Sequence, residues 1–237
     1  MDNPKRYRVD HDSFIRWRGA VLTESNNDMK FRYIAMVLAL HAPALFAAPP
    51  VAELTVTGKV KLPSCAVSIG NDGYYDYGRI SSTLIQSGSE HTKLEPKTEP
   101  MVVTCDAATP LMFSVVDNRK DSSSAPESPY AFGLGNVNGT GKLGHYSVTF
   151  GDLYVDGIGK YVWWKMGDHS NGANWLEAGL KPGRGSFGWG HSGLAGRKFE
   201  AKLTVYPLIG GTTTMNGSLT EPVDLDGSAT LVFAFAL

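Results

Sequence analysis

The chain has 237 residues, of which 42% are hydrophobic and 19% are charged, and its 22 basic and 23 acidic side chains leave a formal net charge of −1. Such a balance supplies no broad cationic surface, so binding to nucleic acid or to anionic lipid is not expected. The low charge and the 27 glycines are also untypical of charged helical bundles and of disordered chains, which leaves one or two globular domains.

A secretory signal peptide is predicted over residues 29–47. Lys30 and Arg32 supply a basic start behind Met29, an apolar run follows, and the segment ends in small residues. Cleavage after Ala47 would leave a mature chain that begins one residue later, and we expect this chain to be exported from the cytoplasm.

The apolar run, residues 34–46, bears on whether the chain stays in a membrane. It is about 13 residues long, whereas a spanning helix needs about 20. A retained signal anchor is therefore the less favoured alternative, and no stable membrane span is expected after processing. Residues 1–28 then form an upstream extension, either a misassigned start or disordered sequence, and we assign them no structural role.

The first predicted strand of the mature chain covers residues 52–62. Leu54, Val56, Gly58 and Val60 fall on one face of it, whereas the residues between them are Thr or Lys. Chain ends usually fray in water unless something holds them. We therefore expect this apolar face to be covered, either by the chain's own sheet or by another chain.

Further strands are predicted because short alternating segments recur between Gly- and Pro-rich turns. Long helices are not expected, since the longest stretch of the mature chain without Gly or Pro, residues 111–125, contains the β-branched pair Val115 and Val116. The pattern favours an antiparallel β-sandwich. The further predicted strands cover residues 101–105, 111–116, 146–150, 199–206 and 229–237.

Cys65 and Cys105 are the two cysteines of the chain, and both follow the predicted signal peptide. An even count in an exported chain predicts one structural disulfide, because the compartments outside the cytoplasm are oxidising. A pair of free buried thiols is the alternative. No C-x-x-C spacing marks a redox site, and the scattered histidines give no metal-ligand spacing.

The last predicted strand places Leu231, Phe233, Phe235 and Leu237 on one bulky apolar face. An apolar chain end is also expected to be held in place. We therefore predict that this strand is held in place, either by its own sheet or by a partner.

Four tryptophans, Trp163, Trp164, Trp175 and Trp189, lie in a Gly-rich segment between residues 161 and 189. We favour an interpretation in which they fill the core of the sandwich. The alternative is a glycan-binding surface, because exposed indole rings beside polar side chains are a common way to hold a ligand with apolar faces.

Signals for catalysis are weak. Residues 139–144 match G-x-G-x-x-G by letter, but a strand-like segment follows where a dinucleotide site needs a helix. The segment Gly190-His191-Ser192-Gly193 lacks the last glycine of a nucleophile elbow. No enzyme activity, no cofactor and no metal are therefore expected.

Several segments, taken in chain order, carry a resemblance to a known family. They are Gly58-Lys59-Val60 with Cys65-Ala66-Val67, Tyr77-Gly78-Arg79-Ile80, Cys105, residues 199–206 and residues 227–233. In this order they resemble the subunits of chaperone–usher pili, and most of all the β-type fimbrial subunits catalogued only as a domain of unknown function. The segment that begins at Tyr77 resembles a short strand of those subunits. The resemblance covers most of residues 53–237.

The resemblance implies an incomplete immunoglobulin-like β-sandwich with Greek-key topology at residues 62–237, which lacks its last strand. Residues 48–61 would then be a donor-strand extension, whose apolar face inserts into a neighbouring subunit. The strand at residues 229–237 would border the groove, and a periplasmic chaperone would cover that groove first.

The function that follows from the resemblance is that of a structural subunit of a fimbria, which passes through the periplasm and polymerises at the cell surface by exchange of donor strands. Its expected partners are a periplasmic chaperone, an outer-membrane usher and neighbouring subunits in a head-to-tail filament. A secreted carbohydrate-binding sandwich or tip adhesin that uses the Trp-rich segment is the alternative, and a β-rich hydrolase is third.

Overall fold

The computed structural model describes residues 52–166 and 169–235, and for residues 169–174 the backbone alone. The predicted signal peptide and the upstream extension lie outside the described residues. The chain divides after Gly58, and the fold below is that of the unit that begins at Lys59. Its described residues contain no helix longer than four residues, and the short 3-10 segments are η2 (Gly70–Gly73), η3 (Ser82–Leu84) and η4 (Lys120–Ser122). The fold is all-β, as predicted.

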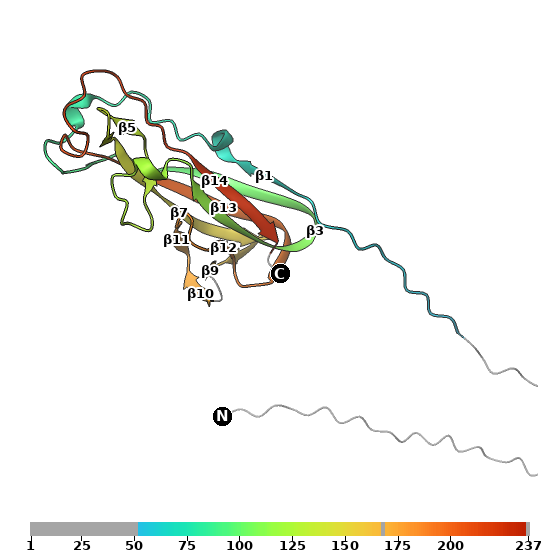
Figure 1. Cartoon of the computed structure of the whole chain (residues 1–237). Coiled ribbons are helices and arrows are strands. Elements are labelled where there is room, and N and C mark those ends of the chain that lie inside the picture. The colour runs from blue at the N-terminus through green and yellow to red at the C-terminus, as the bar shows by residue number, and fades with distance from the viewer. Residues whose placement is uncertain (1–51, 167–168, 236–237) are drawn as a thin grey trace, which may run out of the picture. The chain divides into compact units, whose positions relative to one another are not determined.

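The long strand β3 (Lys97–Asp117) takes part in both sheets of the fold (Figure 1). Its first half pairs with β1 (Cys65–Ile69) and β13 (Ala195–Ile209), and its second half pairs with β12 (Ser186–Trp189) and β14 (Ala229–Phe235). Between the halves, Lys198 of β13 faces Thr104 whereas Gly196 faces Thr109, so β3 carries extra residues there. Such a bulge bends a strand, and here it lets β3 pass from one sheet to the other.

The two sheets have the strand order of an immunoglobulin-like sandwich. In the first sheet β1, β3, β13 and β7 (Gly144–Val155) lie side by side, and in the second the order is β14, β3, β12, β9 (Val162–Met166) and β10 (His169–Trp175). All these pairs are antiparallel, and neighbours in space are often distant in sequence, as in a Greek key. Short strands complete the edges: β2 (Thr92–Lys93), β4 (Phe132–Gly133), β8 (Ile158–Lys160), β11 (Glu177–Gly179), and the separate hairpin of β5 (Asn136–Val137) and β6 (Gly141–Lys142).

Aromatic side chains from both sheets meet in the core. Phe113 of β3 packs edge-on against Phe150 of β7, with ring centroids 5.0 Å apart. Trp189 of β12 lies 5.1 Å from Phe150 and 5.2 Å from Phe199 of β13. The alternation of buried residues along β3 supplies further core side chains, namely Met101, Val103, Cys105, Leu111 and Val115. β3 therefore supplies core side chains from both of its halves, and Phe113 lies at the centre of the aromatic cluster.

A disulfide joins Cys65 of β1 to Cys105 of β3, which confirms the predicted bond. The two cysteines face each other in the antiparallel pair, so the bond fixes the register of β1 on β3. It closes a loop with a sequence separation of 40, which stabilises the fold by about 4 kcal/mol on the chain-entropy model.

Two predicted strands are absent from the described residues. Residues 52–62 form no strand, and neither does the segment from Tyr77 to Ile80. A strand needs a neighbour for its N–H and C=O groups, and in the described part of the chain neither segment has one. The other predicted strands are present, although residues 101–105 and 111–116 belong to the one strand β3.

Replacing Phe113 tests how far the sandwich depends on this centre. Its side chain is fully buried and contacts rings of both sheets, so Phe113→Ala is expected to lower the free energy of unfolding by about 3–5 kcal/mol. Urea denaturation with the disulfide intact measures this. The control is Ile158→Ala on β8, whose side chain is 63% exposed and whose loss should cost no more than about 0.5 kcal/mol. Equal losses in the two variants would contradict this description of the core.

Candidate functional site: an open groove and an aromatic pocket

An elongated groove with a volume of about 1570 Å³ opens into the interior of the sandwich. One wall is formed by residues 69–85, which run from the end of β1 through η3. The opposite wall is formed by residues 219–231, which lead into and along the start of β14. The groove therefore lies between the first and the last strand of the fold.

The floor of the groove consists of core residues from both sheets. Val148 of β7 and Val205 of β13 come from the first sheet, and Val115 of β3 comes from the second. These side chains are buried or nearly so, but the groove reaches them. The floor of the groove is therefore apolar, whereas its walls also carry charged side chains such as Asp72, Asp76 and Glu221.

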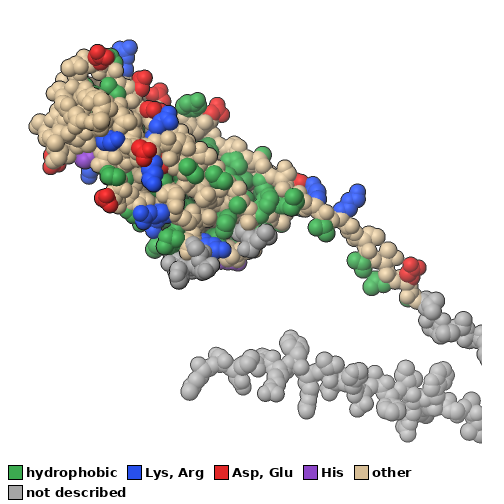
Figure 2. All heavy atoms as spheres, viewed as in Figure 1, with side chains coloured by type: hydrophobic (Ala, Val, Ile, Leu, Met, Phe, Trp, Pro, Cys, Tyr) green, Lys and Arg blue, Asp and Glu red, His purple; other side chains and the backbone are tan. Residues whose placement is uncertain are grey.

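The strand β14 has one open edge. It pairs with β3 through all seven residues, and the described residues hold no second strand beside it. β1 likewise pairs with β3 alone. Open edges of this kind present unpaired N–H and C=O groups to any strand that can reach them. In the space-filling view, apolar side chains gather on the face over β14, with few charged ones among them (Figure 2).

The predicted apolar face of β14 is present in part. Leu231 and Phe233 are half-buried and pack against the core, with the ring of Phe233 5.4 Å from that of Phe113. Phe235, at the end of the strand, is 37% exposed. Leu237 lies outside the described residues.

Two tyrosines hold the first wall of the groove against β13. The hydroxyl of Tyr75 donates to the carbonyl of Leu203 at 3.0 Å, and that of Tyr77 donates to the carbonyl of Val205 at 3.3 Å. Burial raises the pKa of the Tyr75 phenol, and the nearby carboxyl of Glu99 raises it further, so the phenol keeps its proton and this hydrogen bond well into the alkaline range. The resemblance marked the segment that begins at Tyr77, but nothing in the sequence indicated the hydrogen bonds that Tyr75 and Tyr77 make to β13.

The predicted donor-strand residues are exposed. Leu54 has 90% of its surface exposed, and Val56 and Val60 are similarly open. Around Gly58 no atom lies within 4 Å of the position that a Cβ would take. An exposed row of large apolar side chains is unusual for a segment without a partner.

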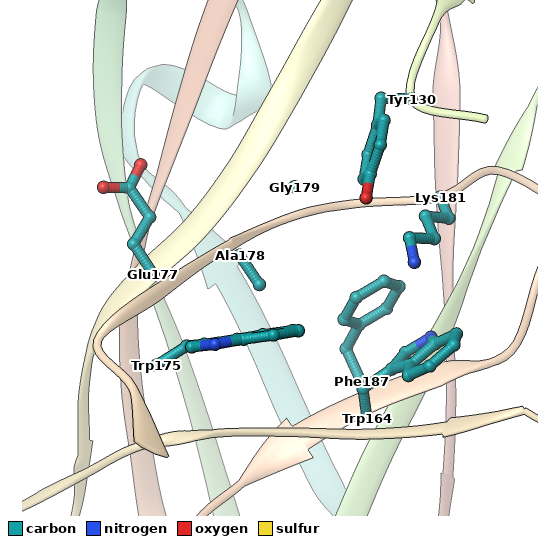
Figure 3. Close-up of a pocket in the computed structure, with 8 residues that line it drawn as sticks. All are labelled: Tyr130, Trp164, Trp175, Glu177, Ala178, Gly179, Lys181 and Phe187. Atoms are coloured by element: carbon teal, nitrogen blue, oxygen red, sulfur yellow. The ribbon is translucent and has the colours of Figure 1, made fainter. Parts of the chain in front are cut away.

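The four tryptophans of the Gly-rich segment separate into two pairs. Trp163 and Trp189 are buried, and the indole N–H of Trp189 donates to the carbonyl of Glu200 at 2.9 Å. Trp164 and Trp175 instead line a second cavity of about 270 Å³ (Figure 3). The prediction of a core role is thus correct for the first pair and wrong for Trp175, which is 53% exposed because it lies at the end of the edge strand β10. Trp164 is partly buried.

Two histidines and a serine form a polar contact beside β7. Nε2 of His91 lies 3.4 Å from Oγ of Ser124, and that oxygen lies 2.8 Å from Nδ1 of His145. Burial lowers the pKa of His145 from its ordinary value of 6.5, and His91 lowers it further.

No cluster of three or more metal-ligating side chains occurs among the described residues. In the same part of the chain, no helix has the length and apolar character needed to cross a membrane.

A family model described as "Protein of unknown function (DUF1120)" matches residues 54–131. The match covers about a third of the chain, and it contains both cysteines, β1 and β3 but ends before β7, β13 and β14. It agrees with the resemblance to a domain of unknown function. The description states no activity and no partner. No curated protein matches the chain.

The pKa of His145 predicts how stability varies with pH. The folded protein binds a proton on the His145 imidazole less tightly than the unfolded chain does. As the pH falls through about 6.5, the unfolded state therefore takes up this proton before the folded state. The free energy of unfolding should therefore fall on acidification, and His145→Asn should flatten this dependence. Urea titrations between about pH 7.5 and pH 5 measure it. His191→Asn, which removes an exposed histidine, is the control. An unchanged slope in His145→Asn would contradict the prediction.

Proposed function

We propose that the chain is a non-enzymatic structural subunit of a surface filament, assembled when a strand of one copy enters the groove of the next. The observation that carries this proposal is the apolar groove between β1 and β14, which reaches core side chains of both sheets. A fold with such an opening is completed by an added strand. The partner strand would pair its backbone with the open edge of β14 and place alternate side chains in the groove.

The segment at residues 54–60 has the properties of that strand. It has seven residues, as many as β14, and both strands would extend about 3.4 Å per residue. Leu54, Val56 and Val60 would then point into the groove, and Gly58 would allow close approach of the backbone there. The Thr and Lys residues between them would face solvent.

Assembly of this kind has a direction. The entering segment lies at one end of the domain sequence and the groove is formed by other residues, so each contact is heterologous and leaves one groove and one donor segment free. Repetition gives a filament rather than a closed dimer. The open groove of a single copy is an aggregation hazard, which is a reason for a periplasmic chaperone to supply a temporary strand before an usher exchanges it.

Two matched substitutions in the donor segment test the proposal. Val56→Asp would place a carboxylate in the apolar groove, and the cost of burying an unpaired charge should weaken self-association by roughly 100-fold or more. Thr57→Asp adds the same charge on the opposite face and should leave self-association within a factor of about three. Light scattering coupled to size exclusion, over a range of concentrations, measures both.

Neither substitution lies in the folded core, so a loss of association cannot be attributed to unfolding. Near-ultraviolet circular dichroism checks that the domain is intact. If the processed chain is a stable monomer on its own, or if the two variants associate equally, the proposal is wrong.

A further inference from the structure

The aromatic pocket lies apart from the groove and is lined by residues of four strands, β9 to β12, and of two loops. Tyr130 comes from the loop before β4, Trp164 from β9, Trp175 from the end of β10 and Phe187 from β12. Gly179 of β11 permits this approach, because a Cβ there would lie 2.8 Å from the ring of Tyr130. Figure 3 shows the rings of Trp175, Phe187 and Trp164 arranged around one space, with the hydroxyl of Tyr130 directed toward it.

Two of these rings also belong to the core, since Phe187 is fully buried and Trp164 is partly buried against it. Tyr130 and Trp175, by contrast, are 41% and 53% exposed. Exposed aromatic faces around a concave surface are costly in water unless a ligand covers them. Flat apolar faces suit the face of a pyranose ring, which carries C–H groups.

Lys181 supplies a cationic donor at the pocket. The ammonium of Lys181 lies 4.2 Å from the ring centroid of Trp164 and 5.2 Å from that of Tyr130, so cation–π contacts hold it at the pocket. No carboxylate pairs with Lys181 among the described residues. The carboxylate of Glu177 points away from the other labelled side chains (Figure 3).

A second donor is the indole N–H of Trp164. Its nitrogen is buried and has no hydrogen-bond partner in the described part of the chain. Buried polar atoms are rarely left unpaired in proteins, and each one has a cost of about 1–3 kcal/mol.

We infer that this pocket binds a pyranose that carries a carboxylate, such as a uronic acid residue of a glycan. The sugar ring lies against Trp175 and Tyr130, and its carboxylate accepts from the ammonium of Lys181. The site is independent of the groove, so it holds whether or not the chain forms filaments. It gives the exposed Trp175 and the half-buried Lys181 a common role.

Sodium D-glucuronate is the probe, and D-glucose and sodium acetate are titrated separately for comparison. Proton–nitrogen correlation spectra of the full chain give one indole N–H signal for each tryptophan. We expect saturable shifts of the Trp164 and Trp175 signals at millimolar glucuronate, with the signals of the buried Trp163 and Trp189 unmoved. Glucose and acetate should bind at least tenfold more weakly, because each lacks one half of the contacts.

Two variants and two matched controls complete the test. Trp175→Ala and Lys181→Met should each weaken glucuronate binding at least tenfold. Tyr154→Ala and Lys120→Met remove an exposed aromatic and an exposed Lys elsewhere, and they should bind as the parent chain does. Absence of saturable shifts, equal binding of glucose or acetate, or unchanged binding by Lys181→Met would each overturn the inference.

Discussion

An immunoglobulin-like sandwich must cover its core along every side, and in this chain one side is open. β14 and β1 are both held by β3 alone, and between them the groove reaches core residues such as Val115 and Val205. The remaining features follow from this opening. A wall of tyrosines is held by hydrogen bonds along one side, and a strand with an unpaired edge runs along the other.

The domain can leave this side open because its stability comes from elsewhere. β3 belongs to both sheets, and Phe113 in its second half contacts rings from β7, β12 and β14. The disulfide fixes β1 to the same strand. The contacts of Phe113 hold the second half of β3 against the facing sheet, and the disulfide fixes β1 to the first half. These links join the two sheets without any strand in the groove. An added strand would therefore complete a fold whose framework already exists.

Much of the fold could be predicted from the sequence, because alternation and turn residues are local signals. Residues 199–206 and 229–235 are strands as expected, and the two cysteines are bonded. That residues 97–117 form one strand with a bulge was not predictable. The bulge depends on a shift in how Gly196 and Lys198 of β13 pair with this strand. The expected strand at residues 52–62 is absent because alternation indicates a face that can be buried, but not whether a neighbour is present.

The sites were predictable to a smaller extent. The groove walls depend on Tyr75 and Tyr77, whose acceptors lie 128 residues further along the chain. In the Trp-rich segment, neighbouring residues on a strand point to opposite faces, so Trp163 enters the core while Trp164 lines the pocket. Lys181 and Tyr130 join that pocket from separate loops, and no spacing in the sequence relates them. Composition located the tryptophans, but three-dimensional packing decided their roles.

On the proposed function, the open edge of β14 accepts an added strand. Amide hydrogen exchange measured with and without a peptide of residues 52–62 tests it most directly. The β14 amides that point away from β3 should exchange fast in the free protein and slow by at least tenfold when the peptide is bound. A peptide with Val56→Asp should give no such protection. If the peptide leaves exchange along β14 unchanged, the groove is not a site for strand addition.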